Sequence, residues 1–289
     1  MRKGRAWRLG RRGLAGLAFA VLAGCQPPPA ADPPTLRISA IPDQAPERVR
    51  QQHEALVERV CATASLSCQW VPADSYEALV ERFGRGEVDL AYFGAVTFVQ
   101  AQHRHGALPL AMRDIDFRFT SVVVVRRDDP AAGLADLHRR PFAFGSRQST
   151  SGHFMARHML GREGVVPERD FAEVFFSGNH DATLRAVAEG RVDAGAVNAT
   201  VYYQRLVAGD PAATSLRVLW QTPPYADYVW ALRPQLSAGL RERLADAFLD
   251  LGRPEDREAL EREGAAGYVP AFPQDFDEVR EVVRAQGQL

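Results

Sequence analysis

The feature that most constrains the fold is a regular alternation of short apolar runs and amphipathic segments along most of the chain. Residues 36–41 alternate apolar and polar side chains, as a half-buried strand does, and residues 46–60 place their apolar side chains on one helical face. The same strand-then-helix order continues to about residue 208. Because parallel strands are usually joined by crossover helices, this order predicts an α/β fold built on parallel sheets.

The limits of the expected elements follow from these patterns and from the glycine and proline residues between them. Strands are expected at residues 36–41, 67–72, 86–94, 108–112, 120–125, 142–145, 172–176, 193–197, 216–221 and 228–232. Helices are expected at residues 46–60, 76–83, 96–103, 150–161, 180–189, 200–208, 237–251, 254–263 and 274–285.

A weak internal repeat suggests that the chain has two halves of similar construction. Residues 86–91 and 190–195 share the order Gly, charged residue, Val, Asp, and each segment follows a helix and leads into a strand. We therefore expect two βαβ domains, one lobe from residues 35–120 and 222–289 and a second lobe from residues 121–221. Two crossings between the lobes would form a hinge and leave a cleft.

The charge of the chain argues against a nucleic-acid partner. The 289 residues are 46% apolar and 25% charged, which is ordinary for a soluble globular protein of about two domains. The net charge of −1 is misleading, because residues 1–24 contain six basic residues and no acidic one. The rest of the chain has 29 basic and 36 acidic residues, a charge of −7, whereas nucleic-acid-binding surfaces are basic.

The first residues have the pattern of an export signal. A basic segment precedes the apolar residues 14–22, a run too short to span a membrane, and small residues follow it. Residues 22–25, Leu-Ala-Gly-Cys, resemble the bacterial lipoprotein box, in which the cysteine receives lipid and becomes the new N-terminus. We expect a signal peptide at residues 1–24, lipidation of Cys25, a proline-rich tether at residues 25–34, and a location in the periplasm or at the cell surface.

Two further cysteines, Cys61 and Cys68, lie between the first expected helix and the second expected strand. An even pair in an oxidising compartment is most simply a disulfide. No metal site is expected, because these cysteines have no nearby ligands and the histidine pairs at 103 and 105 and at 153 and 158 do not share a helical face. No cofactor is expected either.

The polar residues Ser149, Thr150 and Ser151 stand where the helix at 150–161 should begin. Serine and threonine are favoured N-caps, so the segment could be a capped helix and nothing more. The first turn of a helix also leaves N–H groups unpaired and carries partial positive charge, so the same segment could bind an oxyanion. The local sequence favours the simple cap.

Ligands in open α/β sheets lie beyond the carboxyl ends of the strands, so the loops that follow the expected strands hold the candidate residues. These loops are rich in hydrogen-bonding groups, as a small polar ligand requires. They contain Asp43, Gln44, Gly94, Arg113, Ser149 to Ser151, Ser177 to His180, Asn198 and Tyr225 to Asp227.

Three of these segments recur in the same order in one family. Residues 89–94, 149–152 and 177–181 resemble those of the phosphate-, phosphite- and phosphonate-binding proteins of ABC transporters, and the similarity covers about residues 35–250. Finer features at residues 38–44, 113–116 and 222–225 resemble a branch associated with selenate binding. The resemblance implies a two-lobe clamshell of the periplasmic binding-protein type (type II) that closes on an oxyanion.

The resemblance also implies roles for individual residues. Ser149, Thr150 and Ser151 match the hydroxyls and amides that grip the anion, His180 matches a histidine that donates to it, and Tyr76 matches a tyrosine that lines the cleft. The expected ligand-binding residues are Gln44, Tyr76, Phe93, Gly94, Arg113, Ser149, Thr150, Ser151, His180, Asn198, Tyr225 and Asp227.

Departures from the family pattern bear on the ligand. Phe93 replaces a tyrosine of phosphonate binders, and Thr200 replaces a carboxylate that aminoalkyl-phosphonate binders use for the ammonium group. Asp227 is retained. A buried carboxylate suits an anion that still carries a proton, such as monohydrogen phosphate, and would repel a bare dianion such as selenate or sulfate. Asp227 could instead pair with Arg113 or Arg118, and either arginine could clamp the anion.

An enzyme is the weaker alternative. Ser149 or Ser151 would have to act as nucleophile with His180 as base, but Asp181 is adjacent to that histidine and no G-x-S-x-G turn is present. A sensory lipoprotein that reports anion binding to a signalling receptor would use the same clamshell. The favoured function is a monomeric, lipid-anchored solute-binding protein of an ABC importer, which delivers its oxyanion to the membrane permease and catalyses nothing.

Overall fold

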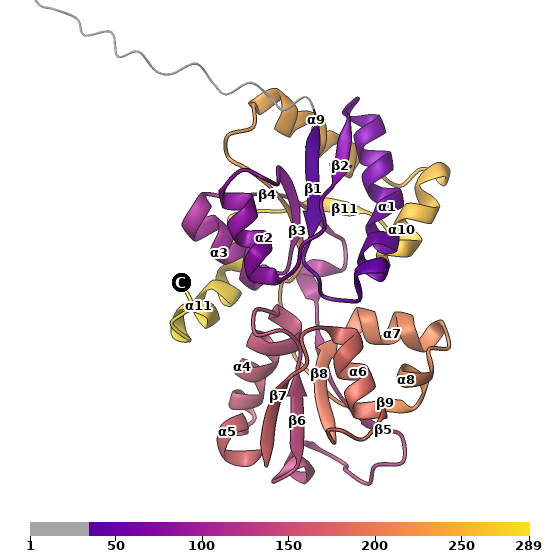
Figure 1. The fold of residues 1–289 in the computed structure, drawn as a ribbon, viewed down its shortest axis with the longest axis vertical. Coiled ribbons are helices and arrows are strands. Elements are labelled where there is room, and N and C mark those ends of the chain that lie inside the picture. The colour runs from indigo at the N-terminus through magenta and orange to yellow at the C-terminus, as the bar shows by residue number, and fades with distance from the viewer. Residues whose placement is uncertain (1–34) are drawn as a thin grey trace, which may run out of the picture.

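The computed structural model describes residues 35–289 as two α/β halves stacked along the long axis of the molecule (Figure 1). The expected signal peptide, lipidation at Cys25 and tether therefore lie outside the described residues. None of the helices among residues 35–289 has the length and apolar character needed to cross a membrane. The two sheets and their helices match the expected α/β class.

The structure contains the following regular elements. The strands are β1 Leu36–Ala40, β2 Cys68–Trp70, β3 Leu90–Phe93, β4 Leu108–Arg113, β5 Ser121–Arg126, β6 Pro141–Phe144, β7 Glu173–Phe176, β8 Ala194–Asn198, β9 Leu216–Gln221, β10 Val229–Leu232 and β11 Tyr268–Pro270. The α-helices are α1 Pro46–Thr63, α2 Tyr76–Gly84, α3 Ala95–His105, α4 Met155–Arg162, α5 Pro167–Asp170, α6 His180–Ala188, α7 Ala199–Val207, α8 Pro211–Thr214, α9 Ala238–Leu249, α10 Arg257–Glu263 and α11 Asp277–Ala285.

The strands form a six-stranded sheet, in the order β11-β4-β10-β3-β1-β2, and a five-stranded sheet, in the order β7-β6-β8-β5-β9. We call the parts built on them the six-stranded half and the five-stranded half. The alternation predicted parallel sheets, and this was wrong for part of each sheet. Strands β1, β2 and β3 are parallel, as are β6, β7 and β8, but β10 and β5 run antiparallel to their neighbours.

Two antiparallel strands, β5 and β10, arise where the chain changes halves, while β11 near the C-terminus also runs antiparallel to its neighbour β4. Residues 114–120 lead from β4 into β5, and residues 222–228 lead from β9 back into β10. A strand that enters a sheet from the other half has no crossover helix to bring it round in parallel, and this explains the direction of β5 and β10. Strand β11 was not predicted, because its three residues are too few to show a period and one of them is a proline, which argues against a strand.

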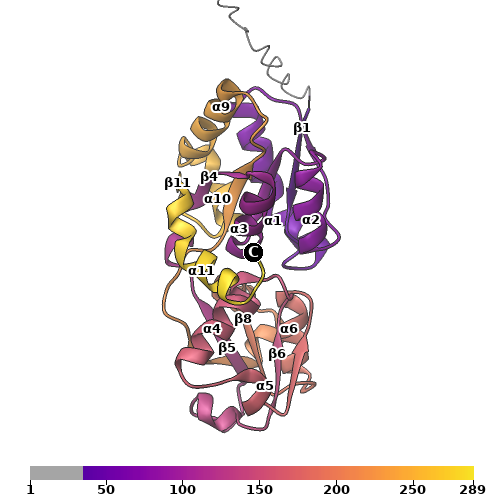
Figure 2. The same cartoon turned by 90° about the vertical axis from the view of Figure 1, so that its left-hand side faces the viewer.

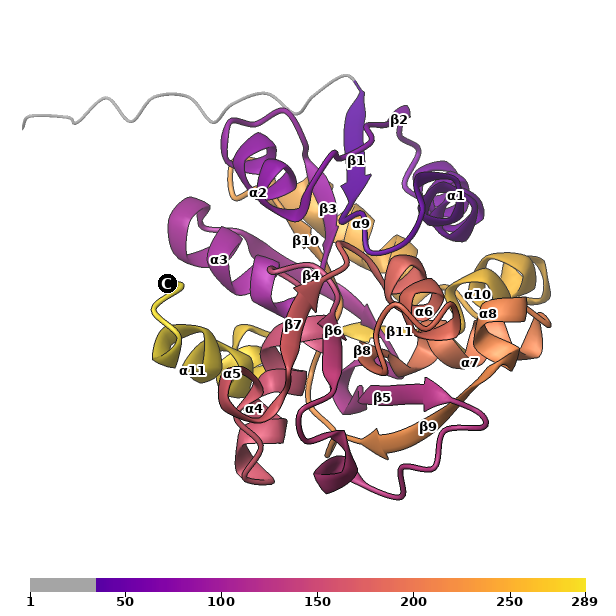
Figure 3. The ribbon, with the colours of Figure 1, turned by 60° about the horizontal axis from the view of Figure 1, so that its bottom comes forward.

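The β-branched run of β5 lies at the centre of the five-stranded half. Val122 to Val125 are all fully buried, because β5 pairs with β8 on one side and β9 on the other and both faces of the sheet are covered. One face packs on α6, α7 and α8, and the other packs on α4 (Figure 3). A strand buried on both faces shows a continuous apolar run instead of alternation.

The two crossings lie side by side between the halves (Figures 1 and 2). Phe119 N donates to Tyr225 O at 2.8 Å, and Tyr225 N donates back to Phe119 O at 2.9 Å. Asp227 N donates to the carbonyl oxygen of Asp116 at 2.9 Å, in the 3-10 turn Asp116–Arg118. The backbone thus joins the crossings into a short two-stranded connection.

A disulfide joins the last turn of α1 to the start of β2 in the six-stranded half. It links Cys61 to Cys68, across a sequence separation of 7 residues. This closes the loop that leads from the first helix to the edge strand of the sheet.

Candidate functional site

The start of α4 is a capped helix whose first turn is opened into a π-helical turn, Thr150–Phe154. The Ser149 side chain accepts a hydrogen bond from Gly152 N at 2.9 Å, and Gly145 N donates to Gly152 O at 2.9 Å. The amides of Thr150 and Ser151 belong to the turn in which a helix has no internal acceptors. The segment is therefore a cap, and it also presents amides and hydroxyls to the space between the halves.

Thr150 reaches from the five-stranded half to the N-terminus of α3 in the six-stranded half. Its Oγ1 accepts from Val96 N at 3.0 Å, and Asp227 Oδ1 accepts from Ala95 N at 3.0 Å. A Cβ on Gly94 would lie 3.0 Å from Thr150 Oγ1 and 3.4 Å from Asp227 Oδ1. The absence of a side chain at Gly94 therefore lets Thr150 and Asp227 converge at one helix end.

His180, the first residue of α6, contributes a buried neutral imidazole. Its Nδ1 accepts from Asn198 N at 3.4 Å, so the ring proton lies on Nε2. Burial lowers the pKa of His180, only partly offset by the carboxylates of Asp43 and Asp181. A Cβ on Gly152 would lie 3.0 Å from the His180 ring, so the imidazole faces the start of α4. His180 is thus a fixed N–H donor.

Three buried polar atoms in this region have no hydrogen-bond partner among the described residues. They are Ser151 Oγ, His180 Nε2 and Asp227 Oδ2. A buried polar group without a partner costs roughly 1–3 kcal/mol, so three together at one place indicate a ligand that supplies the missing bonds. We call the group of side chains formed by Ser149, Thr150, Ser151, His180 and Asp227 the anion chamber.

The carboxyl of Asp227 is the acidic group of the chamber. Burial raises its pKa from 3.8 to about 7, and the hydrogen bond from Ala95 N offsets this in part. The nearby carboxylate of Asp116 raises the pKa further, while the contact with Thr150 lowers it. Near neutral pH the group exists in both protonation states, so it can donate a proton to an oxyanion or accept one from it.

Tyrosines close the chamber beside Asp43. Tyr228 donates to Asp43 Oδ2 at 2.7 Å and accepts from Asn198 Nδ2 at 2.9 Å. Tyr76 is buried, and burial raises the pKa of its phenol, while a hydrogen bond with Ser149 acts in the opposite direction. Tyr228 was missed by sequence reasoning, although it follows Asp227 directly and begins the next expected strand.

Several expected residues lie behind the chamber. Asn198 caps α7 through its Oδ1 and supports Tyr228 and His180, while Tyr225 shares a 2.5 Å hydrogen bond with Ser121 Oγ at the crossings. Phe93 packs against Phe83, with ring centroids 5.3 Å apart, in the core of the six-stranded half. These residues shape the walls of the site.

Gln44 and Thr200 lie outside the anion chamber. The side chain of Gln44 bonds to Gln52 and Arg205 at the edge of the cleft. Thr200 packs near Gly264, beside a surface pocket that Tyr203 also lines. The contacts of Gln44 and Thr200 are thus with residues outside the anion chamber.

Arg113 does not face the ligand space, and this corrects the expectation that it could bind the anion. Its Nε and Nη2 bind the carboxylate of Asp116 at 2.8 and 2.7 Å, and its Nη1 donates to Glu263 O at 2.6 Å. Because Arg113 binds Asp116, it does not form the alternative ion pair with Asp227. Arg118, the other candidate, is exposed. Asp116 lies only three residues after Arg113, so the short turn between them brings the two side chains together.

Comparisons with known proteins show which family the chain resembles over most of its length. The family model described as "ABC transporter, phosphonate, periplasmic substrate-binding protein" matches residues 38–276. A probable ABC transporter phosphite binding protein, PhnD1 of Prochlorococcus marinus, is 29% identical over 272 residues, which is 89% of this chain and 92% of the relative. The phosphate-import protein PhnD of Mycolicibacterium smegmatis is 27% identical, covering 88% of this chain and 87% of the relative.

A solved structure has the same fold. The structure of Prochlorococcus marinus PhnD1 in complex with methylphosphonate has a TM-score of 0.84 and 28% identity, covering 89% of this chain and all of that chain. The expectation of an α/β periplasmic-binding-protein fold is thereby confirmed. The enzyme alternative falls, because these relatives are substrate-binding proteins.

Proposed function

The chain belongs to the family of periplasmic substrate-binding proteins of phosphonate ABC transporters, and we propose that it captures one small tetrahedral oxyanion in the anion chamber and delivers it to the permease. The observation that carries this proposal is the convergence of Ser151 Oγ, His180 Nε2 and Asp227 Oδ2, all buried and unpaired within residues 35–289. Two of these groups donate hydrogen bonds, and the third changes its protonation state near neutral pH.

The ligand class that we propose is a compact phosphorus oxyanion that carries at least one proton, such as phosphite, phosphate or methylphosphonate. A proton-bearing anion can bond to Asp227 in either protonation state of the carboxyl group, whereas a bare dianion such as sulfate or selenate can bond only to the protonated form and is repelled by the ionised one. Burial of His180, Ser151 and Asp227 leaves them no contact with bulk water. An aminoalkyl-phosphonate fits less well, because Thr200 is no carboxylate and packs near Gly264.

The cellular setting is also a proposal. Cys25 would carry lipid, residues 25–34 would tether the folded part to the membrane surface, and the protein would act as a monomer. The lobes would be residues 35–120 with 222–289 and residues 121–221, hinged at the paired crossings. Closure would be a population shift towards the state that the anion prefers.

The proposal is tested on a protein without residues 1–25, by thermal unfolding with phosphate, phosphite, methylphosphonate, sulfate, selenate and selenite. A ligand stabilises the folded state by RT ln(1 + [L]/Kd), so phosphite or methylphosphonate should raise the melting temperature most. Replacing Ser149, Thr150 and Ser151 together by alanine should abolish the shift. If no anion gives a shift at about millimolar concentration, well above the Kd expected of a specific site, the oxyanion function is wrong. If the triple variant keeps the shift, the site lies elsewhere.

A further inference from the structure

The N-termini of α1 and α6 meet across the cleft, next to the anion chamber. His180 N donates to Asp43 O at 2.9 Å, and the neighbouring Asp181 accepts from Ala45 N through its Oδ2, also at 2.9 Å. Asp181 belongs to the five-stranded half, and Asp43 and Ala45 belong to the six-stranded half. A carboxylate placed at the N-terminus of a helix from the other half is stabilised by the helix dipole.

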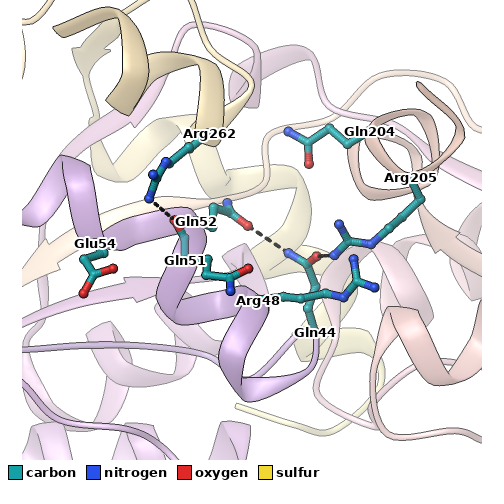
Figure 4. Close-up of a pocket in the computed structure, with 8 residues that line it drawn as sticks. All are labelled: Gln44, Arg48, Gln51, Gln52, Glu54, Gln204, Arg205 and Arg262. Atoms are coloured by element: carbon teal, nitrogen blue, oxygen red, sulfur yellow. Dashed lines mark hydrogen bonds between the residues drawn. The ribbon is translucent and has the colours of Figure 1, made fainter. Parts of the chain in front are cut away.

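Two arginines extend this contact along the edge of the cleft (Figure 4). Arg205 of α7 donates its Nε to Asp181 Oδ1 at 3.2 Å, and its Nη2 donates to the side-chain oxygen of Gln44 in the other half. Arg48 of α1 places its Nε 3.8 Å from Asp181 Oδ2 and its Nη2 3.4 Å from Asp210 Oδ2. Each arginine thus contacts an acceptor in the opposite half.

The burial of these groups differs along the contact. The side chain of Asp181 is 6% exposed and that of Arg205 13%, whereas that of Arg48 is 43% exposed. Gln44, Arg48 and Arg205 line a polar cavity of about 500 Å³ at the cleft edge. Water and salt in this cavity reach the outer part of the contact, while Asp181 is shielded. The pairing of Asp181 should therefore be strong and that of Arg48 weaker and sensitive to salt.

We propose that Asp181, Arg205 and Arg48 form a latch that holds the two halves closed over the anion and so sets its rate of release without touching it. The inference rests on the proposed function. The bonds of Asp181 to Ala45 and Arg48, of Arg48 to Asp210 and of Arg205 to Gln44 join opposite halves, so they exist only when the halves are together. Interactions specific to the closed state raise the apparent affinity of a ligand that requires that state.

The position of Asp181 makes the latch specific to the site. It follows His180 directly on the first turn of α6, so the bond that fixes Asp181 to Ala45 also fixes the backbone that carries the His180 donor. Asp181 and the arginines are positioning residues. Their loss should accelerate anion release and leave the rate of capture almost unchanged, because capture by the open form does not use these bonds.

The test measures association and dissociation rates of phosphite and methylphosphonate by stopped-flow fluorescence, on the protein without residues 1–25. Asp181→Ala should raise the dissociation rate about tenfold, the size expected for a lost charge-assisted hydrogen bond. Asp181→Asn keeps an acceptor for Ala45 N and loses only the charge, so it should raise the rate about threefold, as should Arg48→Met. Association rates should change less than about twofold.

A matched control removes an ion pair within one half. Arg140 pairs with Asp129 and Asp193, both in the five-stranded half, so Arg140→Met should leave both rates as in the wild type. Added salt should speed release from the wild type more than from Arg48→Met, because the exposed pairing of Arg48 is the part of the contact that salt screens. A merely structural role of Asp181 would lower the melting temperature of the ligand-free protein without this salt dependence.

The outcomes separate the latch from the function on which it rests. If the wild type binds an anion but Asp181→Asn and Arg48→Met, both folded by circular dichroism, release it at the wild-type rate, the latch is wrong and the proposed function stands. If Arg140→Met speeds release as much as Asp181→Asn, the effect is general destabilisation and the latch is also wrong. If the wild type binds neither anion, both proposals fall together.

Discussion

At the scale of single residues, the anion chamber combines neutral hydrogen-bond donors with one carboxyl group, Asp227, that is partly protonated near neutral pH. His180 is held as the Nε2–H tautomer by the backbone N–H of Asn198, and Ser151 and Asp227 each keep one polar atom without a partner among residues 35–289. Arginine charge lies behind this layer, where Arg113 is committed to Asp116. Recognition of the anion would thus depend more on the arrangement of hydrogen-bond donors and acceptors than on the net charge of the site.

Replacing Asp227 with Asn should stabilise the ligand-free protein at alkaline pH. The pKa of Asp227 is raised to about 7 by burial, so between pH 4 and pH 7 the unfolded chain loses a proton that the folded protein keeps, and stability falls as pH rises. The rise of the pKa from 3.8 to about 7 corresponds to at most about 4 kcal/mol of lost stability above pH 7, which the variant would recover. Urea unfolding at pH 4 and pH 8 measures this; equal stability of both proteins at pH 8 would contradict it.

The same Asp227→Asn variant should lose discrimination between protonated and bare anions. Its amide oxygen can keep the bond from Ala95 N, and its N–H₂ group then faces the chamber as a donor. We expect the ratio of methylphosphonate to sulfate affinity, measured by calorimetry, to fall at least about tenfold, the size of one lost charge-assisted bond. A ratio equal to that of the wild type would show that Asp227 does not discriminate between protonated and unprotonated anions.

At the scale of elements, the start of α4 shows why glycine is needed in the chamber wall. Gly152 lies in the π-helical turn with its Cα close to Gly145, and a Cβ there would be 2.9 Å from Ser149 Oγ and 3.3 Å from Gly145 Cα. The hydroxyl of Ser149 must accept the Gly152 amide to cap the helix. The cap and the chamber therefore share one crowded turn.

Gly152→Ala should weaken anion binding by at least about tenfold while the protein still folds, because the added methyl group pushes Ser149 and His180 apart. The matched control is Gly161→Ala, in the last turn of α4, where a Cβ would meet nothing within 4 Å. That substitution should gain up to about 1 kcal/mol of stability from helix propensity and leave binding unchanged. Calorimetry measures the anion affinity of both variants, and thermal unfolding measures their stability. If Gly152→Ala binds the anion as tightly as the wild type, the π-helical turn is not part of the site.

At the scale of the whole molecule, each sheet has a core beside it. The halves meet through the two crossings, the polar groups of the cleft and the apolar side chains of Phe154, Met155 and Met159, which join the core of the six-stranded half. The paired backbone of Phe119 and Tyr225 ties the crossings together, so a rotation about them would move one half as a body. Such an arrangement lets a contact at the cleft edge, such as the one at Asp181, influence release of a ligand that it does not touch.

The disulfide between Cys61 and Cys68 should contribute to stability and not to binding. Replacing both cysteines with serine should lower the free energy of unfolding by about 2–3 kcal/mol, the value expected for closing so short a loop in the unfolded chain. Anion affinity should be unchanged, because the bridge lies at the C-terminal end of α1 and the chamber lies near its N-terminal end. Urea unfolding and calorimetry measure the two quantities; a loss of affinity would mean that α1 transmits strain to the cleft.

The sequence by itself determined the elements and most of the loops that carry the site. Periodicity located the strands and helices, the cap residues marked where α4 begins, and the strand-end rule selected the loops of Asp227, His180 and Ser149 to Ser151. These features are local, because they depend on residues a few positions apart. The sequence did not predict that the first turn at the start of α4 would be π-helical.

The tertiary structure alone decided which long-range partners these side chains have. Arg113 faces Asp116 and Glu263 instead of a ligand, Tyr228 joins Asp43 to Asn198, and β5 and β10 run antiparallel. Such pairings depend on how the two halves pack, since a buried polar group binds whatever partner the packing brings within reach. Ser151 Oγ, His180 Nε2 and Asp227 Oδ2, which packing leaves without partners within residues 35–289, are what distinguish a binding chamber from a capped helix.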